Sequence, residues 1–283
     1  MLPNRCLLHR FRLVHRSLSS SASMPPRPPL RVGLLGCGAI GGKVAEMLNA
    51  GDAGAAELGG ILVRSERSDA ERTTLLPSSP ECVTTAADEF FAADWGLCIE
   101  AAGQPAVLEH GKRCLGLGRD FMVTSIGALT DAALYDELAA VAQASGSRLI
   151  LCTGSMPGVD WMGAAAMAGC GAVSVTQTKP PKAWLGTPAE AENPDLLELT
   201  ELRTLFEGSA REAASLYPKN ANVTAMLALA TAGLDATVAK LVADPAASGN
   251  LVHLSFEGPA GKISVDVQAV RCIHTPARPR PTD

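Results

Sequence analysis

The sequence predicts an α/β fold, in which a Rossmann-type doubly wound parallel sheet precedes a smaller α+β substrate and dimerisation domain. Three observations predict it. Apolar runs and helix-compatible stretches alternate from residue 30 to residue 155, a spacing typical of parallel strands joined by helices. A glycine-rich turn directly follows the first of these runs. Beyond Met156 the pattern changes to alternating strands with one wet face, which indicates an open sheet.

The glycine turn GCGAIG is the most informative element, because an apolar run precedes it and a helix-compatible stretch follows it. Gly36 permits the tight turn, Gly38 lets the backbone approach a pyrophosphate, and Gly41 lets the helix pack close to its strand. The amides and the dipole at the start of the helix favour phosphate. We therefore expect a dinucleotide here, against the alternative of an ordinary strand-to-helix turn. The residues expected to contact it are Gly36, Gly38, Ala39, Ile40 and Gly41.

The end of the predicted second strand, residues 58–63, bears on the choice between NAD and NADP. An acidic residue about twenty positions after the glycines normally binds the ribose hydroxyls of NAD. Here Arg64 and Arg67 flank that point instead, and an arginine can pair with the 2′-phosphate of NADP. We expect NAD or NADP as the cofactor, with Arg64 at the ribose end; a solvated charged loop is the alternative.

The rest of the first domain follows the same alternation. Further strands are predicted at residues 83–85 and 96–102, and strands that run into turns of small residues at 120–129 and 149–155. Helices are predicted at 43–48, 106–117 and 131–145. Small residues follow the 96–102 run, so the nicotinamide half of the cofactor is expected against Ala102 and Gln104. Ser155 follows the last strand and is a candidate to donate a hydrogen bond to a substrate carboxylate. Doubly wound folds bind ligands at these carboxyl ends of parallel strands.

The second half is expected to be an α+β substrate domain. Its predicted elements are strands at 173–178, 251–256 and 262–267, a helix at 222–234, and a polar loop at 187–195. Lys179 and Lys182 flank a Pro-Pro turn and are candidates to hold a substrate carboxylate, against the alternative of a solvated turn. The predicted division is a leader at 1–29, a dinucleotide-binding domain at 30–155, an α+β domain at 156–270 and a disordered tail at 271–283.

Composition limits the partners. The formal net charge is −5, yet residues 1–29 hold five arginines and no acid, so the rest of the chain carries −10. An acidic body argues against nucleic acid. No apolar run approaches the roughly 18 residues of a membrane span, and the scattered cysteines form no Cys-x-x-Cys pair for a metal. The leader is typical of a mitochondrial transit peptide, with a disordered extension before Met24 as the alternative, so we expect the mitochondrial matrix or the cytoplasm.

Several segments together resemble the L-aspartate dehydrogenase family. They are the glycine turn, IEAA at 99–102, VTSIGAL at 123–129, KPP at 179–181, YPKNANV at 217–223, and ADP at 243–245 leading to Asn250 and His253. The resemblance implies NAD(P)-dependent oxidation of L-aspartate to iminoaspartate, which hydrolyses to oxaloacetate and ammonia or is consumed in pyridine nucleotide synthesis. It also implies that Ala128 and Asn222 touch the nicotinamide side, that His253 is the catalytic residue, and that the protein is a homodimer.

Elimination among the histidines also leads to His253. Taking a hydride from the Cα of an amino acid requires a neutral amine, so a group that titrates near neutrality must accept the proton. Of the five histidines, two lie in the leader, one on a helix of the first domain and one in the tail. A core histidine is the alternative for His253, and Asn222 is equally suited to cap the helix that follows it.

Two other functions stay open at this point. One is a catalytically silent dinucleotide-binding protein, because the chain departs from the family pattern near its end, where three prolines within residues 271–283 interrupt a final helix. The other is a related dehydrogenase of the same architecture. An enzyme for homoserine or dihydrodipicolinate would need a catalytic lysine or a different histidine motif.

Overall fold

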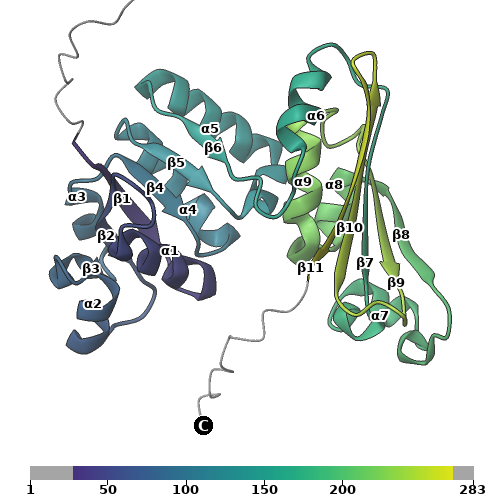
Figure 1. The fold of residues 1–283 in the computed structure, drawn as a ribbon, viewed down its shortest axis with the longest axis horizontal. Helices are drawn as coiled ribbons and strands as arrows, with labels where there is room; N and C mark the ends of the chain where they lie inside the picture. Colours follow the sequence, from purple (N-terminus) through teal and green to yellow (C-terminus); the bar gives the residue numbers. More distant parts are fainter. Residues whose placement is uncertain (1–27, 270–283) are drawn as a thin grey trace, which may run out of the picture.

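The computed structural model describes residues 28–269, which form two packed domains, each built on its own sheet (Figure 1). The first sheet has six strands and the second has five. One hydrophobic core runs through both domains and joins Phe121 and Ile126 of the first to Val175 and Leu254 of the second. The predicted fold class, a doubly wound parallel sheet followed by a smaller α+β domain, is confirmed.

The first sheet is entirely parallel, in the order β3-β2-β1-β4-β5-β6. Its strands are β1 (Leu30–Leu35), β2 (Ala56–Leu62), β3 (Val83–Thr84), β4 (Leu97–Glu100), β5 (Asp120–Val123) and β6 (Leu149–Leu151). The chain winds outward from β1 to β3, then returns to β4 on the other side. This reversal leaves a crevice at the carboxyl ends of β1 and β4, where doubly wound sheets bind their ligands.

Helices cover the first sheet. They are α1 (Ala39–Ala50), α2 (Asp69–Leu75), α3 (Ala87–Ala92), α4 (Gln104–Gly116) and α5 (Ala132–Ser145), with the 3-10 helices η1 (Pro80–Cys82) and η2 (Ile126–Thr130). Their ends follow local rules. Asp131 caps α5 by accepting hydrogen bonds from two backbone amides of its first turn, and the left-handed Gly146 ends it. None of the helices within residues 28–269 is long and apolar enough to cross a membrane.

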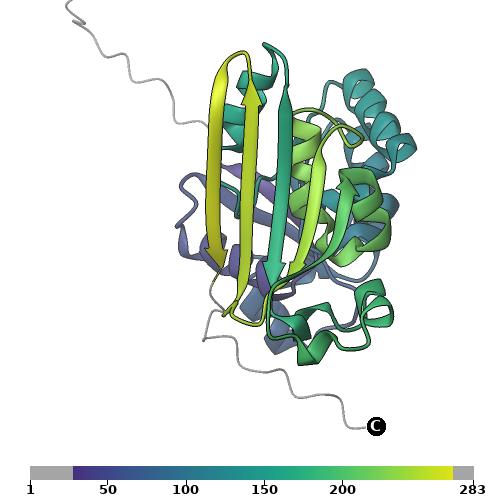
Figure 2. The same ribbon diagram turned by 90° about the vertical axis from the view of Figure 1, so that its right-hand side faces the viewer.

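The second sheet is mixed, in the order β11-β10-β7-β9-β8. Its strands are β7 (Ala172–Lys179), β8 (Arg203–Ser209), β9 (Val238–Ala243), β10 (Asn250–Gly258) and β11 (Gly261–Ala269). The main helices are α6 (Val159–Ala166), α8 (Ala210–Leu216) and α9 (Ala221–Ala230). These helices all lie on the face turned toward the first domain, and the opposite face is open, as Figures 1 and 2 show together.

The alternation of β10 matches this arrangement. Val252, Leu254 and Phe256 are buried and belong to the core with α6 and α9, whereas the residues between them are partly exposed. The register of β7 agrees, since Gln177 pairs with Val252 and donates hydrogen bonds to the backbone oxygen of Asn220 and to Thr224 of α9. Side chains in phase with Val252 therefore face the helices, and those in phase with its neighbours face the open side.

Several predicted bounds were wrong. Within 120–129 the strand is short and ends at Val123, and the glycine turn predicted after it contains η2. The polar loop 187–195 contains a short helix, α7 (Pro188–Glu192), between the 3-10 helices η3 (Pro181–Trp184) and η4 (Leu196–Glu198). The helix predicted to reach residue 234 ends at Ala230. Sequence reasoning did not find α6, β8, α8 or β9.

The predicted division of the chain stays a prediction. Residues 1–27 of the expected leader and the whole expected tail, 271–283, lie outside the described residues. The expected mitochondrial or cytoplasmic location, which rests on that leader, is therefore also still a prediction. Between the two sheets the chain passes from Leu151 through α6 to Ala172, so the predicted limit at residues 155 and 156 falls within this connection.

Candidate active site

The glycine turn joins β1 to α1 with the expected close approaches. Gly36 has φ +85°, a backbone conformation that favours glycine, and a Cβ there would lie 2.7 Å from the Cβ of Ala102. A Cβ at Gly41 would lie 2.2 Å from the backbone oxygen of Gly36. At Gly38, by contrast, a Cβ would meet nothing within 4 Å. The strand and helix are thus packed together at two glycines, while the third opens onto free space beside the helix start, as a bound pyrophosphate requires.

A buried carboxylate holds the two loops that follow β4 and β5. Glu100 has no exposed surface, and its Oε1 accepts hydrogen bonds from the amides of Ala102 and Gly103 at 2.8 and 2.7 Å. Its Oε2 accepts from the amides of Thr124 and Ser125 at 3.2 and 2.9 Å, and the Ser125 hydroxyl donates to Oε1 at 3.0 Å. One side chain therefore fixes the backbone on both sides of the cleft.

A cavity of about 560 Å³ lies at the carboxyl ends of the first sheet, against α9. Its polar lining includes Thr124, Ser125, Thr153, Ser155 and Asn222, and its apolar lining includes Ile40, Ile126, Met156, Val223 and Met226. Both domains therefore build it. A small number of polar groups within a largely apolar lining is typical of cofactor and small-molecule sites.

Asn222 connects the two sides of this cavity. Its Oδ1 accepts a hydrogen bond of 2.9 Å from the amide of Gly127 in η2, 95 positions earlier in the chain. Asn220, not Asn222, stands at the N-cap position of α9. The alternative role of Asn222 as a helix cap is therefore not adopted, and its side chain is turned toward the first domain. Nearby, the Gln104 amide donates to the backbone oxygen of Pro218 at 3.2 Å.

The expected cofactor residues lie in several environments. Ile40, Ser155 and Asn222 line the cavity. Ala128 is 5% exposed within η2, directly after Gly127. Ala102 is exposed beside the glycine turn, and Gln104 begins α4 at the domain boundary. All surround the same end of the first sheet, and their contacts with a cofactor stay a prediction.

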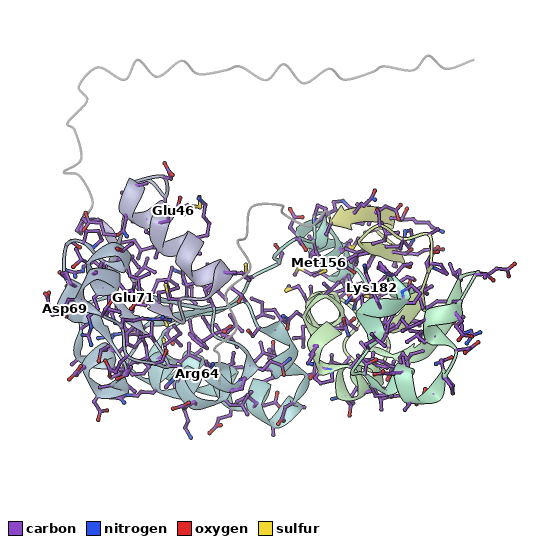
Figure 3. The ribbon with its side chains drawn as sticks, turned by 90° about the horizontal axis from the view of Figure 1, so that it is seen from below. Glu46, Arg64, Asp69, Glu71, Met156 and Lys182 are labelled. Atoms are coloured by element: carbon purple, nitrogen blue, oxygen red, sulfur yellow. The ribbon has the colours of Figure 1, made fainter. Side chains whose placement is uncertain are left out.

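Arg64 follows β2 at the expected ribose end of the site (Figure 3). It is exposed, and among the residues the structure describes it forms no ion pair. The neighbouring Glu66 is held elsewhere, since it accepts from Arg72 at 2.9 Å and from the Thr85 hydroxyl at 2.5 Å. Arg67 is paired with Glu71 at 3.4 Å. The unpaired charge at this point is therefore positive.

His253 does not line the cofactor cavity. In β10 it is one residue out of phase with the core face, pairs across the sheet with Thr176 and Asp266, and lies on the open side. Its Nδ1 lies 2.7 Å from Asp266 Oδ1, and its side chain is 45% exposed. The physical reason is the two-residue period of a strand, which turns Val252 toward the helices and the imidazole away. The catalytic role of His253 stays a prediction that no contact here tests.

Lys179 ends β7 on the core side, but it lines a second cavity and not the cofactor cavity. Its Nζ donates to Asn220 Oδ1 and lies 5.1 Å from the centre of the Trp184 ring. Burial lowers the pKa of the Lys179 ammonium below its ordinary value. Asn220 thus contacts Lys179. Two residues further along the chain, Asn222 lines the cofactor cavity.

Comparison with known proteins decides the family. An L-aspartate dehydrogenase of Ruegeria pomeroyi is 39% identical over 258 residues, which cover 91% of this chain and 89% of the relative. The chain belongs to the L-aspartate dehydrogenase family. The family's relative from Pseudomonas aeruginosa is 39% identical over 232 residues, covering 82% of this chain and 85% of that protein. The family sequence model described as aspartate dehydrogenase, C-terminal, matches residues 160–280.

Membership of this family makes the protein an oxidoreductase with NAD or NADP as its cofactor. The family model described as homoserine dehydrogenase, NAD binding domain, matches residues 36–151, which include the glycine turn and all of the first sheet beyond β1. The crystal structure of aspartate dehydrogenase from Thermotoga maritima superposes with a TM-score of 0.66 at 22% identity, covering 84% of this chain and 89% of that one, and supports the fold.

Three residues of the site were not singled out from the sequence. Glu100 is an acid at the end of an apolar strand. Burying a carboxylate there is costly in free energy unless hydrogen-bond donors surround it, as they do here. Asn220 and Asn250 belong to motifs that the sequence displays, yet nothing in the pattern says which of several asparagines points inward. The register of β7 and β10 places Asn250, and the hydrogen bond from Lys179 places Asn220.

Proposed function

We propose that this chain catalyses the NAD(P)-dependent oxidation of L-aspartate to iminoaspartate, which hydrolyses to oxaloacetate and ammonia. The observation that carries the proposal is the match to proteins named L-aspartate dehydrogenase along 91% of the chain. The glycine turn, with open space at Gly38 and close packing at Gly41, fits a dinucleotide and supports the same activity.

In this proposal the amides at the start of α1 bind the pyrophosphate, and the loops fixed by Glu100 hold the nicotinamide half beside Asn222. When bound, the cofactor supplies a hydride acceptor. The residues of this chain orient the amino acid so that its Cα–H faces that acceptor. The apolar lining from Ile126, Val223 and Met226 limits the access of water while the C–H bond breaks.

A second candidate is a protein that binds NAD(P) without turning over an amino acid. One observation favours it: within residues 28–269 neither histidine lines the cofactor cavity. His110 lies on α4 and packs against Phe91, and His253 lies on the open face of the second sheet. General acid–base catalysis by a positioned imidazole is therefore unsupported within a single described chain.

Steady-state kinetics separates these two functions. Purified chain is mixed with NAD⁺ or NADP⁺ and L-aspartate, and the absorbance of the reduced nicotinamide is followed, with homoserine as the matched control. Reduction with aspartate alone supports the dehydrogenase. Cofactor binding in a thermal-shift assay without reduction by either amino acid supports the silent binding protein. Reduction with homoserine and not aspartate contradicts both.

We further infer that the protein is a homodimer and that the open face of the second sheet is the surface that pairs. The face carries a polar row across all five strands, Asp266, His253, Thr176, Lys240 and Glu207. Side-chain contacts join the residues at each end of this row: His253 contacts Asp266, and Lys240 pairs with Glu207 at 3.0 Å. Light scattering of the purified chain tests this, and a monomer mass at micromolar concentration contradicts it.

A further inference from the structure

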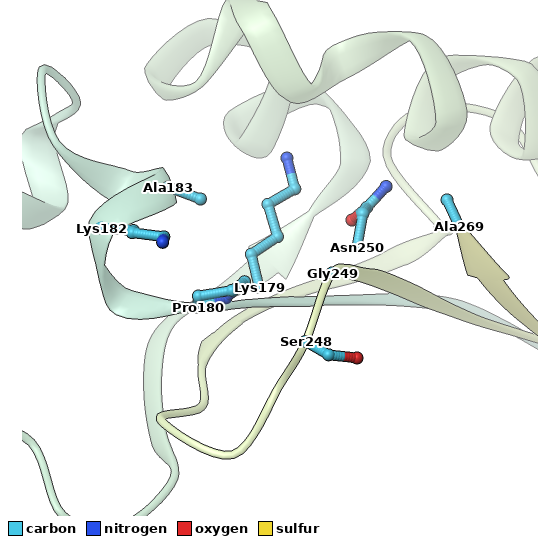
Figure 4. Close-up of a pocket in the computed structure, with 8 residues that line it drawn as sticks. All are labelled: Lys179, Pro180, Lys182, Ala183, Ser248, Gly249, Asn250 and Ala269. Carbon is cyan, nitrogen blue, oxygen red and sulfur yellow. The ribbon is translucent and has the colours of Figure 1, made fainter. Parts of the chain in front are cut away.

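A second cavity, of about 510 Å³, lies at the end of the second sheet where β7 stops and β10 begins (Figure 4). It shares no lining residue with the cofactor cavity. Lys179, Lys182, Ser248 and Asn250 are its polar lining, and no acidic residue of the described chain lines it. Two lysines without a carboxylate in the same cavity give it a positive charge, which favours an anionic ligand.

Lys179 is positioned but not neutralised. Among the described residues it forms no salt bridge, and its one hydrogen-bonded partner is the uncharged Asn220 side chain. The Trp184 ring restrains the ammonium from a second side. An ammonium has three N–H donors, so this contact leaves two for a ligand. A half-buried lysine of this kind gains more from an incoming carboxylate than an exposed one, because solvent screens the pair less.

Asn250 adds an acceptor beside this donor. Its Oδ1 is buried and has no hydrogen-bond partner among the described residues. The pairing of Leu251 with Thr178 brings Asn250 and Lys179 to the same end of neighbouring strands, and Figure 4 shows both side chains extending in the same direction, while Ser248 points the other way. A buried oxygen without a donor is costly unless a ligand supplies one.

The start of α9 makes hydrogen bonds on two sides. Asn220 contacts Lys179 on one side, and Asn222, two residues later, contacts Gly127 on the other. In the proposal that follows, the substrate lies beside Asn220, with its Cα toward the cofactor cavity and its side chain toward Lys179. Carboxylates are acceptors only, so in a dicarboxylic amino acid the amino group alone can donate to Asn250.

We propose that this second cavity binds the side-chain carboxylate of a dicarboxylic amino acid through Lys179, with Asn250 accepting a hydrogen bond from the substrate amino group. The proposal rests on the proposed function and adds the pair of groups that selects the substrate. Lys179 determines specificity for the second carboxylate. The Lys179 ammonium, and not the size of the cavity, distinguishes aspartate from its uncharged amide, asparagine.

The first test measures binding and needs no turnover. Succinate and malonate are titrated by calorimetry into the full chain saturated with NADH or NADPH, for the wild type, Lys179→Met and Lys179→Arg. Lys112→Met, which removes an exposed lysine of α4 paired with Glu137, is the matched control. We expect Lys179→Met to weaken binding about tenfold to a hundredfold, the scale of a charge-assisted hydrogen bond, and Lys179→Arg to retain most of it. Equal binding by Lys179→Met and the wild type overturns the proposal.

The second test compares aspartate with asparagine. In Lys179→Met the value of kcat/KM for aspartate is expected to fall by the same factor as binding, mainly through KM, while the value for asparagine stays near that of the wild type. An equal loss of kcat on both substrates would mean that the lysine moves a proton, and it would overturn the assignment. If the wild type reduces no cofactor with aspartate, the proposed function fails, whereas succinate titration still decides the carboxylate site.

Discussion

Val252 and His253 are neighbours in the chain but lie on opposite faces of the second sheet. The valine is 6% exposed in the core that faces the first domain, and the imidazole lies 2.7 Å from Asp266 on the open side. Successive side chains of a strand point to opposite faces of the sheet, so a shift of one position moves a side chain to the other face. Lys179 and Asn250 are in phase with Val252 and so lie on the side where we propose that the substrate binds.

The first prediction concerns His253→Ala. Because the imidazole faces away from the cofactor cavity of its own chain, we expect kcat/KM with L-aspartate to change by less than about threefold, well short of the roughly hundredfold scale of general acid–base catalysis. Initial rates across a range of aspartate concentrations measure it. A loss of a hundredfold or more would return His253 to the mechanism. Asp266→Asn, which keeps the imidazole, is the control.

Glu100→Gln tests the carboxylate that holds the cleft. The glutamine side chain has the same size but only one oxygen that can accept. Its NH₂ group would face backbone N–H donors that bind Glu100 in the wild type. We expect the free energy of unfolding in urea to fall by about 3 kcal/mol and NADH affinity to fall at least about tenfold. Glu109→Gln on the exposed side of α4 should change neither. Unchanged NADH affinity in Glu100→Gln would show that the loops do not need this carboxylate.

Two glycines of the same turn should respond differently. A methyl group at Gly38 meets nothing in the protein, so Gly38→Ala should fold with normal stability and still lose about tenfold or more in NADH affinity, because the methyl group occupies the space of the pyrophosphate. Gly41→Ala places a Cβ against the Gly36 backbone and should lower stability by about 1–3 kcal/mol. Thermal unfolding and calorimetry separate the two effects; normal NADH binding by Gly38→Ala would argue against a cofactor at this turn.

Arg64 tests the choice between the two cofactors. Because its charge is unpaired and Glu66 is held by Arg72 and Thr85, we expect Arg64→Ala to weaken binding of 2′,5′-ADP and NADP⁺ about tenfold, with NAD⁺ unchanged. Arg113→Ala, which removes an exposed arginine from α4, is the control. Equal effects on NAD⁺ and NADP⁺ would mean that Arg64 does not read the 2′-phosphate.

A carboxylate far from the site links stability to pH. The Arg148 guanidinium donates to Asp120 and, with the Arg148 amide, holds the pKa of that carboxyl below its ordinary value. A lowered pKa in the folded state stabilises the protein above the unfolded pKa, and this contribution is lost as the pH falls through the folded value. We expect Asp120→Asn to cost about 1–2 kcal/mol at pH near 7 and nothing in acid below both pKa values, measured by urea unfolding. A difference that persists in acid would contradict the linkage.

Periodicity and turn chemistry were sufficient for the first domain. The glycine turn and the parallel strands follow from local patterns that the fold keeps. Asn222 was singled out through the family resemblance, and its contact with Gly127 joins residues 95 positions apart. The second domain depended on information that is not local. Strand β8 and helix α8 were missed although Ser209 and Glu212 form a capping box, a pattern readable in the sequence.

The limits of prediction are clearest at the candidate site itself. Elimination among histidines selected a residue type suited to the chemistry, but only the pairing of β10 with β7 and β11 determines which side chain faces the cleft. The same register brings Lys179 and Asn250 together across more than seventy positions of sequence. A predicted strand fixes the period of its side chains and not their phase relative to a distant helix.

The measurement that tests the central claim most directly is the aspartate-to-asparagine ratio of kcat/KM for the wild type and Lys179→Met, read from the absorbance of the reduced cofactor. The account predicts that the wild type reduces its cofactor with aspartate in strong preference to asparagine, and that the variant loses this preference. No reduction with aspartate, or a preference that survives in Lys179→Met, would contradict it.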